Sequence, residues 1–166
     1  RGLGAGGQPE KGKEAAKESA GEIKEALKGA DMVFVCAGLG GGTGTGVAPE
    51  VAKIAQDMGA IVIGVATTPF SIERARIDKA EHGLRMLRGV CNTVVVIDNN
   101  RLVKIAGQLP VKQAFAVANE LISVMIKGIV EIISVPSLVN LDFADVKAIM
   151  SSGQVATVGI GASDTA

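Results

Sequence analysis

The sequence predicts an α/β fold in which helices cover a parallel β-sheet. Three short apolar runs rich in Val and Ile alternate with segments of helical periodicity, the pattern of parallel strands joined by right-handed crossovers. Aliphatic residues and 22 glycines are abundant, whereas aromatic residues make up only 2% of the chain. Such an aliphatic core suits strands that are buried on both faces.

The elements are expected in a regular order along the 166 residues. Pro9 and Glu10 are placed as first-turn residues of one surface helix that runs to Lys28 and turns its charged side chains to solvent. The later elements are strand 32–36, helix 47–58, strand 61–66, helix 74–88, strand 93–97, a short helix to about Ala106, helix 110–133 and strand 156–160. Because ligands of such sheets bind at the carboxyl ends of the strands, we expect the functional residues at that edge.

The charge balance and the cysteines narrow the functional class. The 17 basic and 17 acidic side chains cancel, which argues against nucleic acid as a partner. Cys36 and Cys91 stand at the ends of apolar strands, so we expect buried thiols in a reduced, cytoplasmic setting, and no signal peptide is visible. Four charges make helix 110–133 too polar to span a membrane, namely Lys112, Glu120, Lys127 and Glu131.

The stretch Gly38 to Gly46, GLGGGTGTG, joins the first strand to the helix that follows it. Six glycines in nine positions are more than packing explains, and we expect them to let a phosphate approach the backbone amides. Val47 follows Gly46 where a Walker A loop has Lys, and Thr43 stands where the dinucleotide motif needs its last glycine. A flexible glycine-rich linker is the alternative, and the regular pattern of the flanking segments disfavours it.

The motif GGGTGTG after an apolar strand, in the setting AGLGGGTGTGVAPEVAKIA, closely resembles the signature of the tubulin superfamily and, within it, of the FtsZ family of prokaryotic cell-division GTPases. Two further strings resemble the same family. RGLGAGGQPE at residues 1–10 resembles its loop that senses the terminal phosphate, although the residues alone also suit an N-terminal tail. NLDFADVK at 140–147 resembles its loop that enters the nucleotide pocket of the next subunit; an N-cap at Asp142 and a first-turn Asp145 are the alternative explanation.

The resemblance implies a three-layer, Rossmann-like GTPase domain with a long central helix and the start of a second α+β domain. On this basis residues 1–109 form a partial GTP-binding domain, 110–133 the central helix, and 134–166 the synergy loop with the beginning of the C-terminal domain. The family begins with a further βαβ segment that carries its first phosphate loop. We therefore expect this chain, as a fragment, to bind GTP weakly and to hydrolyse it negligibly by itself.

The resemblance also implies roles for individual residues. Glu73 and Arg76 would contact ribose and phosphate, although one residue fewer than usual separates them. Asn99 and Asn119 would flank guanine, and Asn119 stands where the family usually has Asp. The phosphates would be held by the amides and hydroxyls of Ala5, Gly6, Gly7, Gly40, Gly41, Gly42, Thr43, Gly44, Thr45 and Gly46. The residues implied to act on the partner's nucleotide are Asn140, Asp142 and Asp145.

The function that the resemblance implies is that of a cytoskeletal GTPase. Such a protein binds GTP or GDP with Mg²⁺, polymerises head to tail into filaments for cell division, and hydrolyses GTP at a site that the neighbouring subunit completes. Its implied partners are further copies of itself and division-site adaptor proteins, which alone connect it to the membrane, and its implied place is the cytoplasm at the division site. Two alternatives are a non-catalytic piece that binds or caps filaments and a nucleotide-binding α/β domain unrelated to tubulin.

Overall fold

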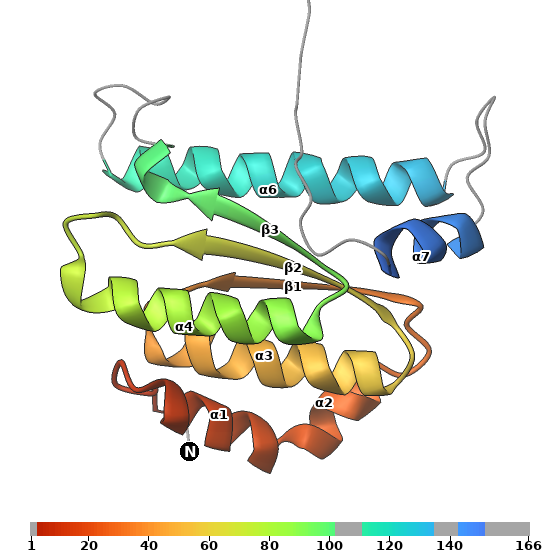
Figure 1. The fold of residues 1–166 in the computed structure, drawn as a ribbon, viewed down its shortest axis with the longest axis horizontal. Helices are drawn as coiled ribbons and strands as arrows, with labels where there is room; N and C mark the ends of the chain where they lie inside the picture. The colour runs from red at the N-terminus through yellow and green to blue at the C-terminus, as the bar shows by residue number, and fades with distance from the viewer. Residues whose placement is uncertain (1–2, 102–110, 135–142, 152–166) are drawn as a thin grey trace, which may run out of the picture.

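A computed structural model describes residues 3–101, 111–134 and 143–151. Its centre is a parallel sheet of three strands in the order β1-β2-β3, with β1 at Met32–Gly38, β2 at Ile61–Thr68 and β3 at Thr93–Asp98 (Figure 1). The register pairs Met32 with Ile61 and Ile63 with Thr93. The predicted parallel α/β fold is confirmed, and each strand continues one or two residues past its predicted end.

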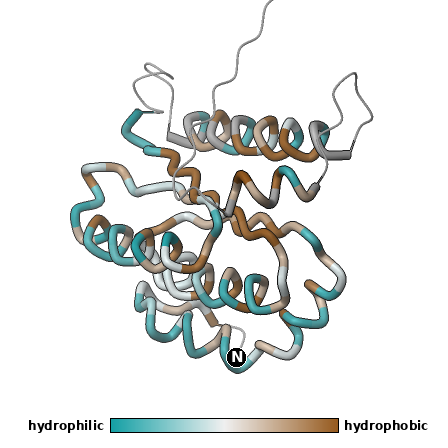
Figure 2. Tube along the Cα trace, turned by 45° about the vertical axis from the view of Figure 1, so that its right-hand side comes forward, coloured by the Kyte–Doolittle hydropathy of each residue, from teal (hydrophilic) through white to brown (hydrophobic). Residues whose placement is uncertain are grey.

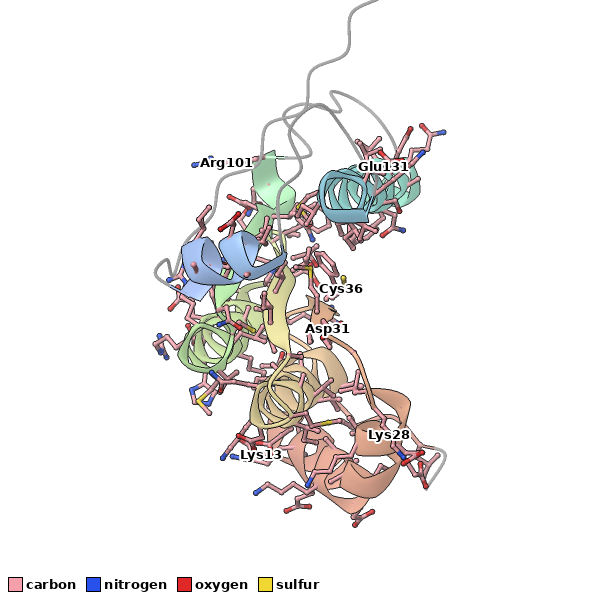
Figure 3. All side chains as sticks on the ribbon, turned by 90° about the vertical axis from the view of Figure 1, so that its right-hand side faces the viewer. Lys13, Lys28, Asp31, Cys36, Arg101 and Glu131 are labelled. Carbon is pink, nitrogen blue, oxygen red and sulfur yellow. The ribbon has the colours of Figure 1, made fainter. Side chains whose placement is uncertain are left out.

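Helices lie on both faces of this sheet (Figures 1 and 3). One face is covered by α3, Gly42–Asp57, and α4, Arg74–Val90, with α1, Pro9–Glu18, and α2, Ala20–Ala26, packed outside α3. The other face is covered by α6, Val111–Ser134, and α7, Phe143–Ser151. In Figure 3, Lys13 projects from the outer layer, whereas Glu131 projects from α6 on the opposite side.

Alternation along the strands divides the core in two. Val33, Val35 and Val62 face α3 and α4, whereas Ile63 and Val65 face α6. Every residue of β2 from Ile61 to Ala66 is buried, as expected for a central parallel strand. Figure 2 shows the hydrophobic colour concentrated on the strands and the hydrophilic colour on the outer helices. The predicted aliphatic core is therefore correct.

The predicted single helix from Glu10 to Lys28 is wrong, because the segment forms two helices that meet at Ser19. This residue has φ −96° and ψ 15°, outside the helical region, while its amide still donates to the Ala15 carbonyl. Serine has a low helix propensity, which permits the break. The helices before and after Ser19 differ in burial, because α1 buries Gly12 and Ala16 while α2 has no buried residue.

Helix α3 begins at Gly42 and not near Val47, so the glycine-rich loop is only Leu39–Gly41. Gly42, Gly44 and Gly46, half of the six glycines, therefore lie inside a helix. Residues 99–101 begin a helical turn, and the remainder of the predicted short helix lies outside the described residues, as does the predicted strand 156–160. No helix within the described ranges is long and apolar enough to cross a membrane.

The prediction that both cysteines are buried is correct for Cys91 and wrong for Cys36. Strand β1 lies at one edge of the described sheet, and Cys36 shares a side of it with Met32 and Phe34, which are only half-buried. Figure 3 places Cys36 at the margin of the sheet. Partial burial raises the pKa of the Cys36 thiol above its ordinary value.

Candidate functional site

The first glycine-rich segment makes a tight turn at the carboxyl end of β1. Leu39 donates its amide to the Thr67 carbonyl at 2.9 Å, and Gly40 donates its amide to Thr45 Oγ1, also at 2.9 Å. Gly40 has φ +102°, and a Cβ atom there would lie 2.9 Å from the Cβ of Arg76. Only glycine satisfies both the backbone conformation and this close approach. Thr45 is buried, so its hydroxyl serves this turn.

The expectation that these glycines are not needed for packing is wrong for three of them. A Cβ atom at Gly44 would lie 2.1 Å from the Gly38 carbonyl oxygen, and one at Gly46 would lie 2.0 Å from the Pro9 carbonyl oxygen. A Cβ atom at Gly42 would lie 2.7 Å from the Gln8 amide. These glycines let α3 lie directly against β1 and against the segment that leads into α1.

The start of α3 retains the features of an anion site. Gly41 is its N-cap, so no side chain caps the helix, and the first turn carries no acidic residue. The amides of Gly42, Thr43 and Gly44 therefore point toward the open end of the helix, where its dipole favours negative charge. Thr43 is exposed, and Gly41 and Gly44 are half-buried. A Cβ atom at Gly41 would meet nothing within 4 Å.

The second glycine-rich segment lies beside the first. Gly6 and Gly7 both have left-handed φ values, +58° and +72°, and Gln8 donates its amide to the Ala5 carbonyl at 3.0 Å. This is the pattern of a type I′ turn, which needs positive φ at both central residues. Ala5 packs so closely on Gly42 that a Cβ atom at Gly42 would lie 2.8 Å from the Ala5 Cβ. The structure thus brings the two predicted phosphate segments together.

A cavity of about 410 Å³ opens between these segments and α1. Its wall includes Gly4 and Ala5 from the turn, Thr43 and Val47 from α3, and Lys11 from α1. This volume lies within the range of small-molecule sites. Within the described ranges, no group of three or more His, Cys, Asp or Glu side chains is placed to hold a metal ion.

Glu73 and Arg76 lie at the start of α4 and bind each other. The guanidinium of Arg76 donates to Glu73 Oε2 at 2.8 Å, and Glu73 Oε1 accepts the Phe70 amide at 3.1 Å. Both carboxylate oxygens of Glu73 are therefore engaged within the protein. The stem of Arg76 packs over Gly40, so this ion pair lies directly beside the first turn.

Asn99 follows β3 at the same edge of the sheet. It is only 4% exposed, yet its side-chain oxygen Oδ1 has no hydrogen-bond partner among the described residues. A buried amide oxygen without a partner is costly. A ligand that donates a hydrogen bond to Asn99 would remove this cost.

Asn119 lies on the exposed surface of α6. The Phe115 ring, one helical turn earlier on the same face, contacts Phe70 edge-on with ring centroids 5.4 Å apart. Phe70 belongs to the loop that follows β2. This contact holds the start of α6 against the loop that follows the carboxyl end of β2, and Asn119 lies one helical turn after Phe115.

Asp145 is exposed in the first turn of α7, far from the glycine segments. Figure 1 shows α7 beside the amino ends of the strands, whereas the turns before α1 and α3 lie at their carboxyl ends. A single chain therefore does not bring Asp145 to its own glycine segments. The predicted residues Asn140 and Asp142 lie outside the described residues.

Comparison with known proteins decides the family. Residues 1–107 match the family described as "Tubulin/FtsZ family, GTPase domain", which covers the strands, both glycine segments and Asn99. The chain belongs to the tubulin/FtsZ family. The resemblance seen in the motifs is thus confirmed.

Relatives within the tubulin/FtsZ family match nearly the whole chain. It is 57% identical to "Cell division protein FtsZ 2" of Methanocaldococcus jannaschii, over 99% of this chain and 43% of that protein. It is 56% identical to "Cell division protein FtsZ 1" of Thermococcus kodakarensis, over 99% of this chain and 44% of that protein. The chain therefore spans less than half the length of these relatives.

Solved structures show the same fold. The structure titled "FtsZ dimer, empty (M. jannaschii)" superposes with a TM-score of 0.87 at 51% identity and covers 93% of this chain and 46% of that one. "CetZ from Methanosaeta thermophila" superposes with a TM-score of 0.77 at 24% identity, which shows a shared fold.

Two groups at this candidate site were not predicted from the sequence. Asp98 Oδ1 accepts both the backbone and side-chain amides of Asn100, and Asn100 Oδ1 accepts the Ser71 amide at 2.8 Å, which ties the carboxyl ends of β2 and β3 together. The second group is Lys79, whose ammonium donates to the Gly7 carbonyl at 2.6 Å. The Asp98-Asn99-Asn100 string after a strand is a detectable turn signal, whereas nothing local marks Lys79.

Proposed function

We propose that this chain is part of a GTP-binding and GTP-hydrolysing protein that polymerises head to tail into filaments for cell division. The observation that carries the proposal is the position of α7, with Asp145, at the opposite end of the sheet from the uncapped start of α3. Head-to-tail stacking would bring these two ends together. Residues 1–109 would form part of the GTP-binding domain, 110–133 the central helix, and 134–166 the synergy loop and the start of the next domain.

The phosphates would bind where the two glycine segments meet. The amides of Gly42, Thr43 and Gly44 form the start of α3, and the Ala5–Gln8 turn adds the amides of Gly6 and Gly7. Amides that converge in this way bind phosphate without a lysine in the loop. The open space at Gly41 would let the phosphate lie against the backbone.

The base would lie between Asn99 and Asn119. Each side-chain amide offers a donor and an acceptor, and the unpartnered oxygen of Asn99 suits the donor groups on the edge of guanine. Adenine presents a different donor and acceptor pattern. We therefore propose that the site prefers GTP and GDP to ATP.

Hydrolysis would occur between subunits. Phosphoryl transfer needs stabilised charge and a positioned water more than covalent chemistry. Glu73 is engaged by Phe70 and Arg76, whereas Asp145 is exposed at the far end of the molecule. The exposed carboxylate of a neighbour would orient the attacking water. We propose that Mg²⁺ arrives on the phosphates, which is its usual mode in nucleotide sites, and that adaptor proteins hold the filament at the division site.

Substituting Gly41 tests the phosphate site. Gly41→Ala is compatible with the backbone, since φ is −91° and ψ is −179°, and the added methyl group meets no protein atom. We expect the Kd for a fluorescent GTP analogue to rise about tenfold or more, because the methyl group occupies the phosphate's space. Gly89→Ala, at another open position, should leave the Kd unchanged. Equal binding by both variants, or binding of ATP as tight as that of GTP, would refute this site.

Mixing two variants tests hydrolysis between subunits. Asp145→Ala keeps the nucleotide site but lacks the carboxylate, and Gly41→Ala keeps the carboxylate but binds nucleotide weakly. Each variant alone should therefore release little phosphate from GTP. In a head-to-tail contact, the Gly41→Ala chain presents Asp145 to nucleotide held by the other variant. We expect a mixture to regain phosphate release, and the wild-type specific rate to be low and to rise with protein concentration. A mixture no more active than its components, beside an active wild type, would contradict the shared site.

A further inference from the structure

The exposed side chain of Lys79 on α4 connects two segments that are 72 residues apart. Its ammonium nitrogen lies 2.6 Å from the Gly7 carbonyl oxygen and donates a charge-assisted hydrogen bond to it. Gly7 is a central residue of the Ala5–Gln8 turn. Bonds from an ionised donor are about twice as strong as neutral ones.

The turn itself has little else to hold it. Its central residues, Gly6 and Gly7, are exposed and have the wide conformational freedom of glycine. Within the described part of the chain, its one internal hydrogen bond joins the Gln8 amide to the Ala5 carbonyl at 3.0 Å. The amides of Gly6 and Gly7 donate to no group in that part of the chain. The bond from Lys79 therefore selects one arrangement among many.

Lys79 belongs to one stripe of α4 that contacts both glycine segments. Arg76 packs over Gly40, and Gly83 lies so close to Thr45 that a Cβ atom there would be 2.6 Å from its methyl group. Lys79 stands between them at helical spacing. The same rigid helix thus positions the first segment through Arg76 and Gly83 and the second through Lys79.

We propose that Lys79 is a positioning residue that holds the Ala5–Gln8 turn in the arrangement that presents the Gly6 and Gly7 amides to the terminal phosphate of a nucleoside triphosphate. In the proposed site the turn would reach the terminal phosphate and the start of α3 would hold the others, so loss of Lys79 should weaken binding of the triphosphate more than that of the diphosphate. This inference rests on the proposed nucleotide site.

The test compares GTP and GDP affinities, by competition with a fluorescent GTP analogue, for the wild-type chain and three variants. Lys79→Met removes the hydrogen bond and keeps the length of the side chain. Lys79→Arg keeps a cationic donor. Lys53→Met removes an exposed lysine from α3 and serves as the control for charge. We expect Lys79→Met to lower the ratio of GTP to GDP affinity about fivefold, and the other two variants to keep it within about twofold.

Amide hydrogen exchange without nucleotide supplies an independent measurement. Because the Lys79 bond orders the turn, the Gln8 amide should exchange several times faster in Lys79→Met than in Lys79→Arg or the wild type. Unchanged exchange with weaker GTP binding would mean that Lys79 contacts phosphate directly, which overturns the positioning role. Unchanged GTP and GDP affinities in Lys79→Met also overturn it and leave the nucleotide site intact. If the wild-type chain binds neither nucleotide, the proposed function itself fails, and this inference fails with it.

Discussion

Gly46 provides a quantitative test of how α1 packs on α3. A Cβ atom at this position would lie 2.0 Å from the Pro9 carbonyl oxygen and 2.8 Å from the Lys13 amide, and both neighbours are backbone. To accommodate the methyl group, α1 would have to move until the distance from the added Cβ atom to the Pro9 carbonyl oxygen reaches about 3.4 Å. Overpacking of this kind costs about 3 kcal/mol, and the better helix propensity of alanine returns about 1 kcal/mol. We therefore expect Gly46→Ala to lower the free energy of unfolding by about 2 kcal/mol or more.

The assay is thermal and urea unfolding followed by far-UV circular dichroism. A loss of this size corresponds to a fall in Tm of about 4–8 °C for a chain of this length. Gly128→Ala is the matched control, since Gly128 also lies inside a helix but an added Cβ atom meets nothing within 4 Å. Alanine should stabilise the chain there by about 0.5–1 kcal/mol. A Gly46→Ala chain as stable as the wild type would refute the close-packing explanation.

Three further predictions concern side chains at strand ends. Burial raises the pKa of Cys91 to about 11, and a hydrogen bond with the backbone of Gly64 opposes part of this rise. The folded state therefore keeps a thiol proton that the unfolded state loses near pH 9, so the free energy of unfolding should fall by about 2–3 kcal/mol from pH 9 to 11. Cys91→Ala should lack this fall in urea titrations. Asn92→Ala removes the acceptor of the Val62 amide, at 2.8 Å, and should cost about 1–2 kcal/mol in urea unfolding, while Asn92→Asp, which keeps the acceptor, should cost less. Asn99→Ala should leave the nucleotide-free free energy of unfolding unchanged or raise it, because it removes a buried oxygen that has no partner among the described residues, yet it should abolish the rise in Tm that saturating GTP gives the wild type.

The fold could be predicted because its signals are local. Runs such as Thr93 to Ile97 combine β-branched residues with the length of a strand, and the segments between them have helical periodicity. The predicted start of α3 was wrong because glycine has low intrinsic helix propensity, whereas Gly42, Gly44 and Gly46 are helical for a tertiary reason. Their missing side chains let the helix approach β1 and α1. Packing overrode propensity, and only the structure shows what each glycine meets.

The candidate site, like the fold, could be predicted from the sequence only in part. Its first glycine segment stands out in the sequence because six of the nine residues from Gly38 to Gly46 are glycine, and Asn99 was implied by the family resemblance. The unpartnered state of the Asn99 oxygen and the pairing of Glu73 with Arg76 depend on how the strand ends meet. No local pattern specifies which groups a fold brings together. The same holds for Cys36, whose exposure follows from the position of β1 at an edge of the described sheet.

Helix α4 explains how two flexible glycine segments form one site. Each segment has one hydrogen bond of its own, from Gly40 to Thr45 in the first and from Gln8 to Ala5 in the second, and both contain glycines with wide backbone freedom. Arg76, Lys79 and Gly83 face them from a single rigid element, with a packing contact at each end and a hydrogen bond between. Because α4 is held to the sheet by buried Ala80 and Leu87, an anion that orders the turns acts against a fixed support. The site therefore gains part of its rigidity from α4, which contacts both segments.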